Sequence, residues 1–105
     1  MQADELLIEI SEKNSQKAFK LLFESYYPSL CIFGRRYIES EEIVEDVVQD
    51  VFTSLWENRH RINIETSAKN YLITMTRNFC LNYLQRNRIE QNYIQGKMTN
   101  PFEIG

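Results

Sequence analysis

A long apolar stripe with helical spacing runs through the middle of the chain and constrains the fold more than any other feature. Its members recur every three or four residues, which places them on one face of a helix. Valine favours strands, but the sustained spacing outweighs that propensity. Ser40 supplies a capping hydroxyl and Glu41 and Glu42 supply acids for the first turn, so we expect a helix over 41–57. The stripe consists of Val44, Val47, Val48, Val51 and Leu55.

Three further segments, near 4–12, 15–38 and 67–88, have helical patterns. Asn14 and Ser15 indicate a break and a cap, and Thr66 and Ser67 cap the last helix. Pro28 is expected to kink or split the helix over 15–38. The expected apolar faces are Leu6, Leu7 and Ile10; then Ala18, Phe19, Leu21, Leu22, Phe23, Ser25, Leu30, Phe33 and Tyr37; then Ala68, Leu72, Met75, Thr76, Phe79, Cys80 and Tyr83.

The chain length and composition favour one all-helical domain. A chain of 105 residues with 43% hydrophobic residues supports a single packed core. With 3 Gly and 2 Pro it has too little turn chemistry for many short strands. We therefore expect an all-α fold, a compact bundle of three main helices plus a short N-terminal helix, within residues 1–90. Periodicity is lost after residue 88, so 91–105 is predicted to be a linker or disordered tail.

Several function classes are disfavoured by the sequence. No apolar run is long enough for a membrane span, and the N-terminus does not resemble a signal peptide, so a cytoplasmic location is expected. Cys31 and Cys80 lie far apart in apolar stretches, which indicates reduced core thiols rather than metal ligands. No acid–base pair, nucleophile or ligand cluster is visible. We therefore expect no cofactor, no metal and no enzymatic activity.

Charge divides the chain into two unlike halves. Residues 1–58 carry five basic groups against twelve acidic ones, a net charge of −7. Residues 59–105 carry seven basic groups against three acidic ones, a net charge of +4. Such a distribution suits two partners of opposite charge.

The segment from Val44 to Trp56, VEDVVQDVFTSLW, resembles region 2.2 of group IV (extracytoplasmic-function) sigma factors of the sigma-70 family. That signature has an acidic pair, two aliphatics, Gln and an acid, then Phe and, four residues on, Trp or Tyr. Upstream, the spacing of Ala18-Phe19, Leu22-Phe23 and Tyr26-Tyr27-Pro28 is similar to region 2.1. Downstream, Ala68, Tyr71-Leu72, Met75 and Arg77-Asn78 are similar to regions 2.3 and 2.4. Three motifs in the family's order cover about residues 15–88.

The resemblance implies two binding surfaces, and the first is the outward face of the helix over 41–57. It is expected to dock on the clamp helices of the β′ subunit of core RNA polymerase. Carboxylates at helical spacing can pair with arginines of a partner helix, and an aromatic side chain adds buried area. The alternative from the residues alone is a solvated acidic face, with Trp56 closing the core. The expected docking residues are Asp46, Gln49, Asp50, Thr53, Trp56 and Glu57.

The second surface comprises the 59–67 loop and the outward face of the helix after it. The resemblance implies that it captures a flipped non-template base and melts the promoter −10 element. Basic groups neutralise phosphates, while amides and hydroxyls bond to bases or backbone. The alternative is an ordinary polar loop and a solvated helix face. The expected DNA-binding residues are Arg59, Arg61, Asn63, Thr66, Ser67, Lys69, Asn70, Tyr71, Thr74, Arg77, Asn78, Arg86 and Arg88.

Other interpretations remain open from sequence. A helical protein–protein adaptor without a DNA role would show the same acidic face. An enzyme or metal-binding bundle would need inward Glu and His pairs, but the inward faces are apolar. An anti-sigma factor is a further expected kind of partner, on which the sequence is silent. Full-length members of the family carry a second, helix-turn-helix domain (region 4), so we expect this sequence to be part of a longer protein rather than a one-domain variant.

Overall fold

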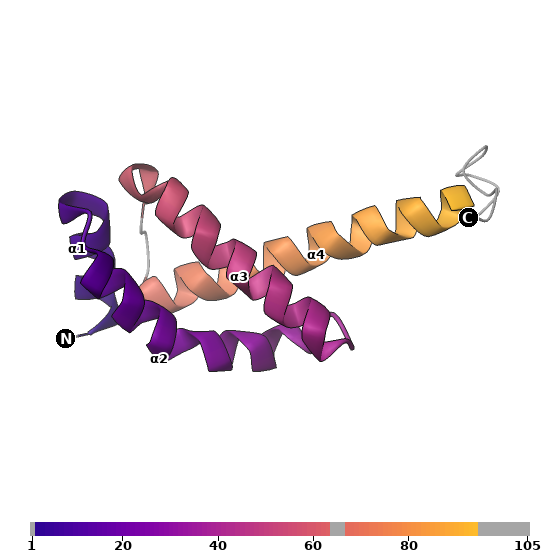
Figure 1. The fold of residues 1–105 in the computed structure, drawn as a ribbon, viewed down its shortest axis with the longest axis horizontal. Coiled ribbons are helices and arrows are strands. Elements are labelled where there is room, and N and C mark those ends of the chain that lie inside the picture. The colour runs from indigo at the N-terminus through magenta and orange to yellow at the C-terminus, as the bar shows by residue number, and fades with distance from the viewer. Residues whose placement is uncertain (1, 64–66, 95–105) are drawn as a thin grey trace.

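The computed structural model describes residues 2–63 and 67–94, and side chains as far as residue 88. The described part is all-α, as predicted, and its helices enclose one apolar core (Figure 1). In chain order the elements are α1 (Ala3–Lys13), α2 (Gln16–Gly34), α3 (Glu41–Glu57), the short 3-10 helix η1 (Arg59–Arg61) and α4 (Ala68–Ile94).

Serine caps fix the starts of the three main helices. Each hydroxyl precedes its helix and accepts a hydrogen bond from a backbone N–H of the first turn, which otherwise has no partner in the helix. Ser40 starts α3 at the predicted residue, and Ser67 fills the expected role at α4. The bonds run from Ala18 N to Ser15 Oγ (3.0 Å), from Ile43 N to Ser40 Oγ (3.2 Å) and from Asn70 N to Ser67 Oγ (3.1 Å).

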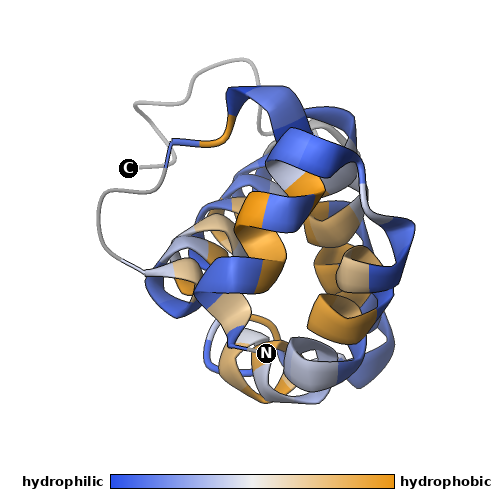
Figure 2. Ribbon diagram, turned by 90° about the vertical axis from the view of Figure 1, so that its left-hand side faces the viewer, coloured by the Kyte–Doolittle hydropathy of each residue, from blue (hydrophilic) through white to orange (hydrophobic). Residues whose placement is uncertain are grey.

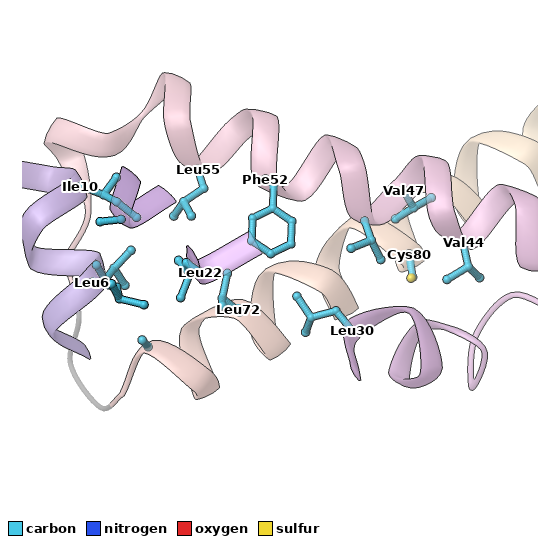
Figure 3. Packing of buried hydrophobic residues seen from close by; sticks show 14 of the residues in the cluster. Leu6, Ile10, Leu22, Leu30, Val44, Val47, Phe52, Leu55, Leu72 and Cys80 are labelled. Atoms are coloured by element: carbon cyan, nitrogen blue, oxygen red, sulfur yellow. The ribbon is translucent and has the colours of Figure 1, made fainter. Parts of the chain in front are cut away.

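The core lies between α3 on one side and α2 and α4 on the other, with α1 closing one end. Figure 3 shows Phe52 of α3 reaching in toward Leu22 and Leu72. Figure 2 shows hydrophobic segments turned mainly toward the enclosed space. Full burial of each such side chain contributes roughly 1.5–3 kcal/mol. The five residues of the predicted stripe on α3 are all buried, which confirms the helical interpretation of the valine-rich segment.

Pro28 lies inside α2 without splitting it. Proline has no N–H to donate to the preceding turn and its ring presses against that turn, so it bends a helix that continues through it. Figure 1 shows α2 changing direction part-way along its length. The bend lets one helix follow the core from α1 to the start of α3.

Helix α2 ends at Gly34, earlier than the predicted end near residue 38. The Tyr37 and Ile38 amides both turn back to the Gly34 carbonyl, at 2.9 and 3.1 Å. Gly34 is buried, and a Cβ there would lie 2.9 Å from Val44 Cγ1. Position 34 therefore has no room for a side chain beside α3, and Ile38 is still buried beyond the turn.

The predicted apolar face of α2 was wrong at three positions. Leu21 is 42% exposed and Ser25 is also exposed, because the buried line instead follows Ala18, Leu22 and Leu30. Phe33 is half-buried outside the core cluster, where it contacts the Tyr37 ring (centroids 5.6 Å apart). Arg36 lies over the same Phe33 ring.

Helix α4 continues to Ile94, beyond the predicted end near 88. Loss of the apolar pattern marks where a helix leaves the core, and it does not mark where the backbone hydrogen bonds stop. The polar run from Gln85 to Arg88 contains good helix formers. Figure 1 accordingly shows the C-terminal part of α4 extending past the other helices.

Candidate functional site

The outward face of α3 is open to solvent along its length. Asp46, Gln49, Asp50, Thr53 and Glu57 are all exposed. Within the described part of the chain the ion pairs are Lys13–Glu9 and Arg35–Glu41, so the three acids of this face are not engaged by a neighbouring cation. These carboxylates are therefore available to a partner. The structure brings these five predicted docking residues together on one face.

Trp56, the sixth predicted docking residue, lies at the edge of the core. It is half-buried, and its ring centroid lies 5.3 Å from that of Phe19 on α2. The Arg59 guanidinium lies over the indole, 4.1 Å from its centroid, an attractive cation–π geometry. Trp56 thus helps join α2, α3 and η1, and a partner would reach only part of it.

Gln49 connects the docking face to α2 through Tyr27. A hydrogen bond with Gln49 lowers the pKa of Tyr27, but burial and the charges of Cys31 and Glu45 outweigh it and raise that pKa above 10.0. Burial likewise raises the pKa of the Cys31 thiol, which is partly buried and packs against the core. Cys80 is buried as predicted, and burial raises its pKa as well.

The segment after α3 contains both engaged and free side chains. Arg59 Nε donates to Asn14 Oδ1 at 2.8 Å, and Arg59 Nη1 donates to the Trp56 carbonyl at 2.7 Å. The Arg59 guanidinium therefore supports the fold. Arg61 and Asn63 are exposed. Thr66, predicted to bind DNA, lies outside the described residues.

One outward stripe of α4 carries five of the thirteen predicted DNA-binding residues. Its exposed members recur at intervals of three and four, so they share a face opposite the buried Leu72, Thr76 and Cys80. Thr76 needs no external partner because its hydroxyl donates to the Leu72 carbonyl at 2.8 Å. The stripe consists of Asn70, Thr74, Arg77, Asn78, Leu81, Gln85 and Arg88.

Two predicted cationic residues of α4 lie beside this stripe, on opposite sides. Lys69 lines a groove of about 230 Å³ toward α2, with Tyr26 and Phe33 among its neighbours. Arg86 lines a larger groove of about 640 Å³ between α3 and α4, shared with Asp50 and Glu57. The two surfaces therefore meet along this groove.

Tyr71 is half-buried and packs against the core rather than standing free on the stripe. Burial raises its pKa above 10.0. Ser67 is half-buried, and its hydroxyl is occupied by the cap of α4.

Sequence reasoning missed part of the α3–α4 groove. It is also lined by Ser54, Phe79, Asn82 and Gln85, which were not among the expected docking or DNA-binding residues. The signal that could have found the polar ones is helical spacing, because Ser54 lies between Asp50 and Glu57 on one helix and Asn82 between Asn78 and Gln85 on the other. The set could not be assembled without the relative rotation of α3 and α4.

A comparison with protein-family models matches residues 22–89 to sigma-70 region 2. The chain belongs to the sigma-70 region 2 family. No curated protein and no solved structure shows a significant match to it. The matched range contains most of α2, all of α3 and η1, and the part of α4 that carries the outward stripe.

Membership of the sigma-70 region 2 family indicates the process in which these surfaces take part. This region of sigma factors takes part in binding core RNA polymerase and in promoter melting, and it is a transcription-initiation domain rather than a known enzyme family. Among the described helices, none combines the length and apolarity that crossing a membrane requires. Across residues 2–63 and 67–88, no three His, Cys, Asp or Glu side chains are grouped as a metal site would require.

Proposed function

We propose that the chain is the region 2 domain of a group IV sigma factor, acting in the cytoplasm through two adjoining surfaces. The outward face of α3 docks on the β′ clamp helices of RNA polymerase. The outward stripe of α4, with Arg61, Asn63 and the first turn of α4, binds the non-template strand of the −10 element and helps to melt it. Thr66 stays a predicted member of the second surface.

The observation that carries the proposal is the exposed acidic face of α3 within a family-matched domain. Asp46, Asp50 and Glu57 face solvent without an ion-pair partner in the described part of the chain. Exposed carboxylates lose little by forming charge-assisted hydrogen bonds to arginines of a second helix. Gln49 and Thr53 add neutral hydrogen-bonding groups on the same face.

The DNA-binding part is supported by the composition of the α4 stripe. Arg77 and Arg88 can each neutralise a phosphate, and Asn70, Asn78 and Gln85 can bond to bases or backbone. None of the residues of this described stripe is acidic, so the stripe carries no carboxylate that would repel a nucleic acid. Lys69, on the α2 side, lies where it can meet a strand that leaves the stripe near the start of α4.

Strand binding is tested with a short, fluorescently labelled single-stranded DNA of mixed sequence, with its duplex for comparison. We expect salt-dependent binding that favours the single strand. Arg77→Ala removes one phosphate contact, so binding should weaken about fivefold and the salt slope should fall by about 0.7. The matched control is Lys17→Ala, which removes an exposed cation of α2 outside the stripe.

Equal binding by Arg77→Ala and Lys17→Ala would show that the α4 stripe is not the contact surface. No binding of either DNA form by the wild-type chain would leave an adaptor role on the acidic face as the better account.

A further inference from the structure

Helix α1 bonds to both flanks of the segment that joins α3 to α4. Near its C-terminal end, the Asn14 side chain and the Ser11 carbonyl accept hydrogen bonds from Arg59 and His60 of η1. At its N-terminal end, Asp4 Oδ1 accepts a hydrogen bond from the Ala68 N–H of α4 at 2.7 Å. Figure 1 shows α1 at the same end of the molecule as η1 and the start of α4.

The bond from Ala68 to Asp4 anchors the first turn of α4. The first four amides of a helix have no partner within it, and Ser67 satisfies only the amide of Asn70. The Asp4 carboxylate satisfies the Ala68 amide from a different helix. A negative charge is also favourable at the positive end of the α4 dipole, and this contact is partly buried. Asp4 therefore fixes where α4 begins relative to α1.

The contacts to η1 fix the other flank. Asn14 has a left-handed backbone (φ 53°) that ends α1 and turns its side chain toward Arg59. The His60 Nδ1 lies 3.0 Å from the Ser11 carbonyl, and because a carbonyl can only accept, Nδ1 carries the proton. Arg59 also contacts Trp56, so the same guanidinium joins α1 to the end of α3.

The anchored flanks carry side chains of the proposed DNA surface, namely Arg61 and Asn63 on one side and Ser67, Lys69 and Asn70 on the other. The family match begins at residue 22, so α1 (Ala3–Lys13) lies outside it. We infer that α1 is a positioning element for strand binding, with Asp4 as its principal positioning residue. This inference rests on the proposed function and deepens it.

Loss of the anchor should weaken strand binding while leaving docking intact. Without the Asp4 carboxylate the first turn of α4 can shift or fray, and the strand must then pay the cost of ordering it. Because a helix-cap contact of this kind is modest, we expect binding of the strand to weaken roughly threefold to tenfold in Asp4→Ala. The exposed face of α3 does not contact Asp4, so binding to a β′ clamp-helix fragment should not change.

Three companion variants separate positioning from general stability. Asp4→Asn keeps an oxygen acceptor for the Ala68 amide and should retain most of the strand affinity. Glu5→Ala removes the other acid of the first turn of α1, with the same loss of charge, and should bind like wild type. Asn14→Gly keeps the left-handed backbone without strain but removes the acceptor for Arg59 Nε, so it should weaken binding in the same direction as Asp4→Ala.

The experiment measures anisotropy with the labelled mixed-sequence single strand and, in parallel, amide hydrogen exchange of the full chain. Faster exchange at Ala68, Lys69 and Asn70 in Asp4→Ala, with unchanged exchange in the middle of α3, is the expected signature. The inference is supported if this exchange pattern appears and if Asp4→Ala weakens strand binding whereas Glu5→Ala does not.

Failure of the inference about α1 and failure of the proposed function give different results. If the wild-type chain binds the strand and Asp4→Ala binds it equally well, α1 has no positioning role and the proposed function stands. If Glu5→Ala weakens binding as much as Asp4→Ala, the effect is one of charge and the inference is overturned. A wild-type chain that does not bind the strand overturns the proposed function, while unchanged exchange in Asp4→Ala overturns the anchoring role independently of DNA.

Discussion

Gly34 of α2 lies against both α3 and α4. A Cβ at this position would lie 2.9 Å from Val44 Cγ1 and 3.6 Å from Cys80 Sγ. Val44 is fully buried and β-branched, so its side chain has little freedom to rotate away. The absence of a side chain at residue 34 therefore sets how near α2 comes to α3.

Gly34→Ala should lower the free energy of unfolding by about 1–2 kcal/mol. The added methyl overpacks the contact with Val44, and this cost exceeds the gain in helix propensity, which is at most about 1 kcal/mol. Urea unfolding of the single and double variants measures it. Val44→Ala should destabilise the wild-type chain but cost less in the Gly34→Ala background, because it removes the clash. Additive effects of the two substitutions would contradict the proposed contact.

Cys80 gives the protein a pH-dependent stability above neutrality. Burial raises its pKa above the ordinary 9.0, so the folded chain holds the thiol proton at pH values where the unfolded chain releases it. The stabilising contribution is therefore complete below the unfolded pKa and is lost as the pH rises from there through the folded pKa. The slope for one such group is at most about 1.4 kcal/mol per pH unit.

The measurement is the free energy of unfolding from neutral pH to above the ordinary thiol pKa of 9.0, for wild type and Cys80→Ala. The variant should be less stable at neutral pH because it leaves a small cavity, yet its stability should fall less steeply with pH. Part of the slope should remain, because burial also raises the pKa of Cys31 and of Tyr71. Parallel curves for the two proteins would rule out Cys80 as a source.

At the scale of helices, local signals determined where elements start more reliably than where they stop. Ser15, Ser40 and Ser67 act as caps in the structure because a capping hydroxyl bonds within three residues of itself. The end of α2 is a turn in which the Tyr37 and Ile38 amides bond to the Gly34 carbonyl, beside a close approach of Gly34 to Val44 of another helix. Helix α4 extends to Ile94 because its backbone stays helical after the apolar pattern of its side chains ends.

Some features of the candidate site likewise follow from local sequence signals, whereas others depend on contacts between residues far apart in the chain. Exposure of Asp46, Asp50 and Glu57 follows from the helical period alone, so the sequence could place them on one face. Engagement of Arg59 by Asn14, and the bond from Ala68 to Asp4, join residues far apart in the chain. Neither bond leaves a periodic or compositional signal, and sequence reasoning therefore treated α1 only as part of the core.

At the scale of the whole molecule, the acidic and basic surfaces share a border. Asp50 and Glu57 face Arg86 across the groove between α3 and α4. A partner bound to α3 and a nucleic acid bound to α4 would therefore lie close to one another. This arrangement fits a domain that must hold a protein and a DNA strand at the same time.

Docking of the outward face of α3 on RNA polymerase is tested most directly by measuring binding of the chain to a β′ clamp-helix fragment. Fluorescence anisotropy should show saturable binding by the wild-type chain. Asp50→Arg places a cation in the middle of the face and should weaken binding at least tenfold, which corresponds to about 1.4 kcal/mol. Glu24→Arg, the same charge reversal at an exposed position of α2, should bind like wild type. Equal binding by all three chains, or no binding by the wild-type chain at low salt, would contradict the account.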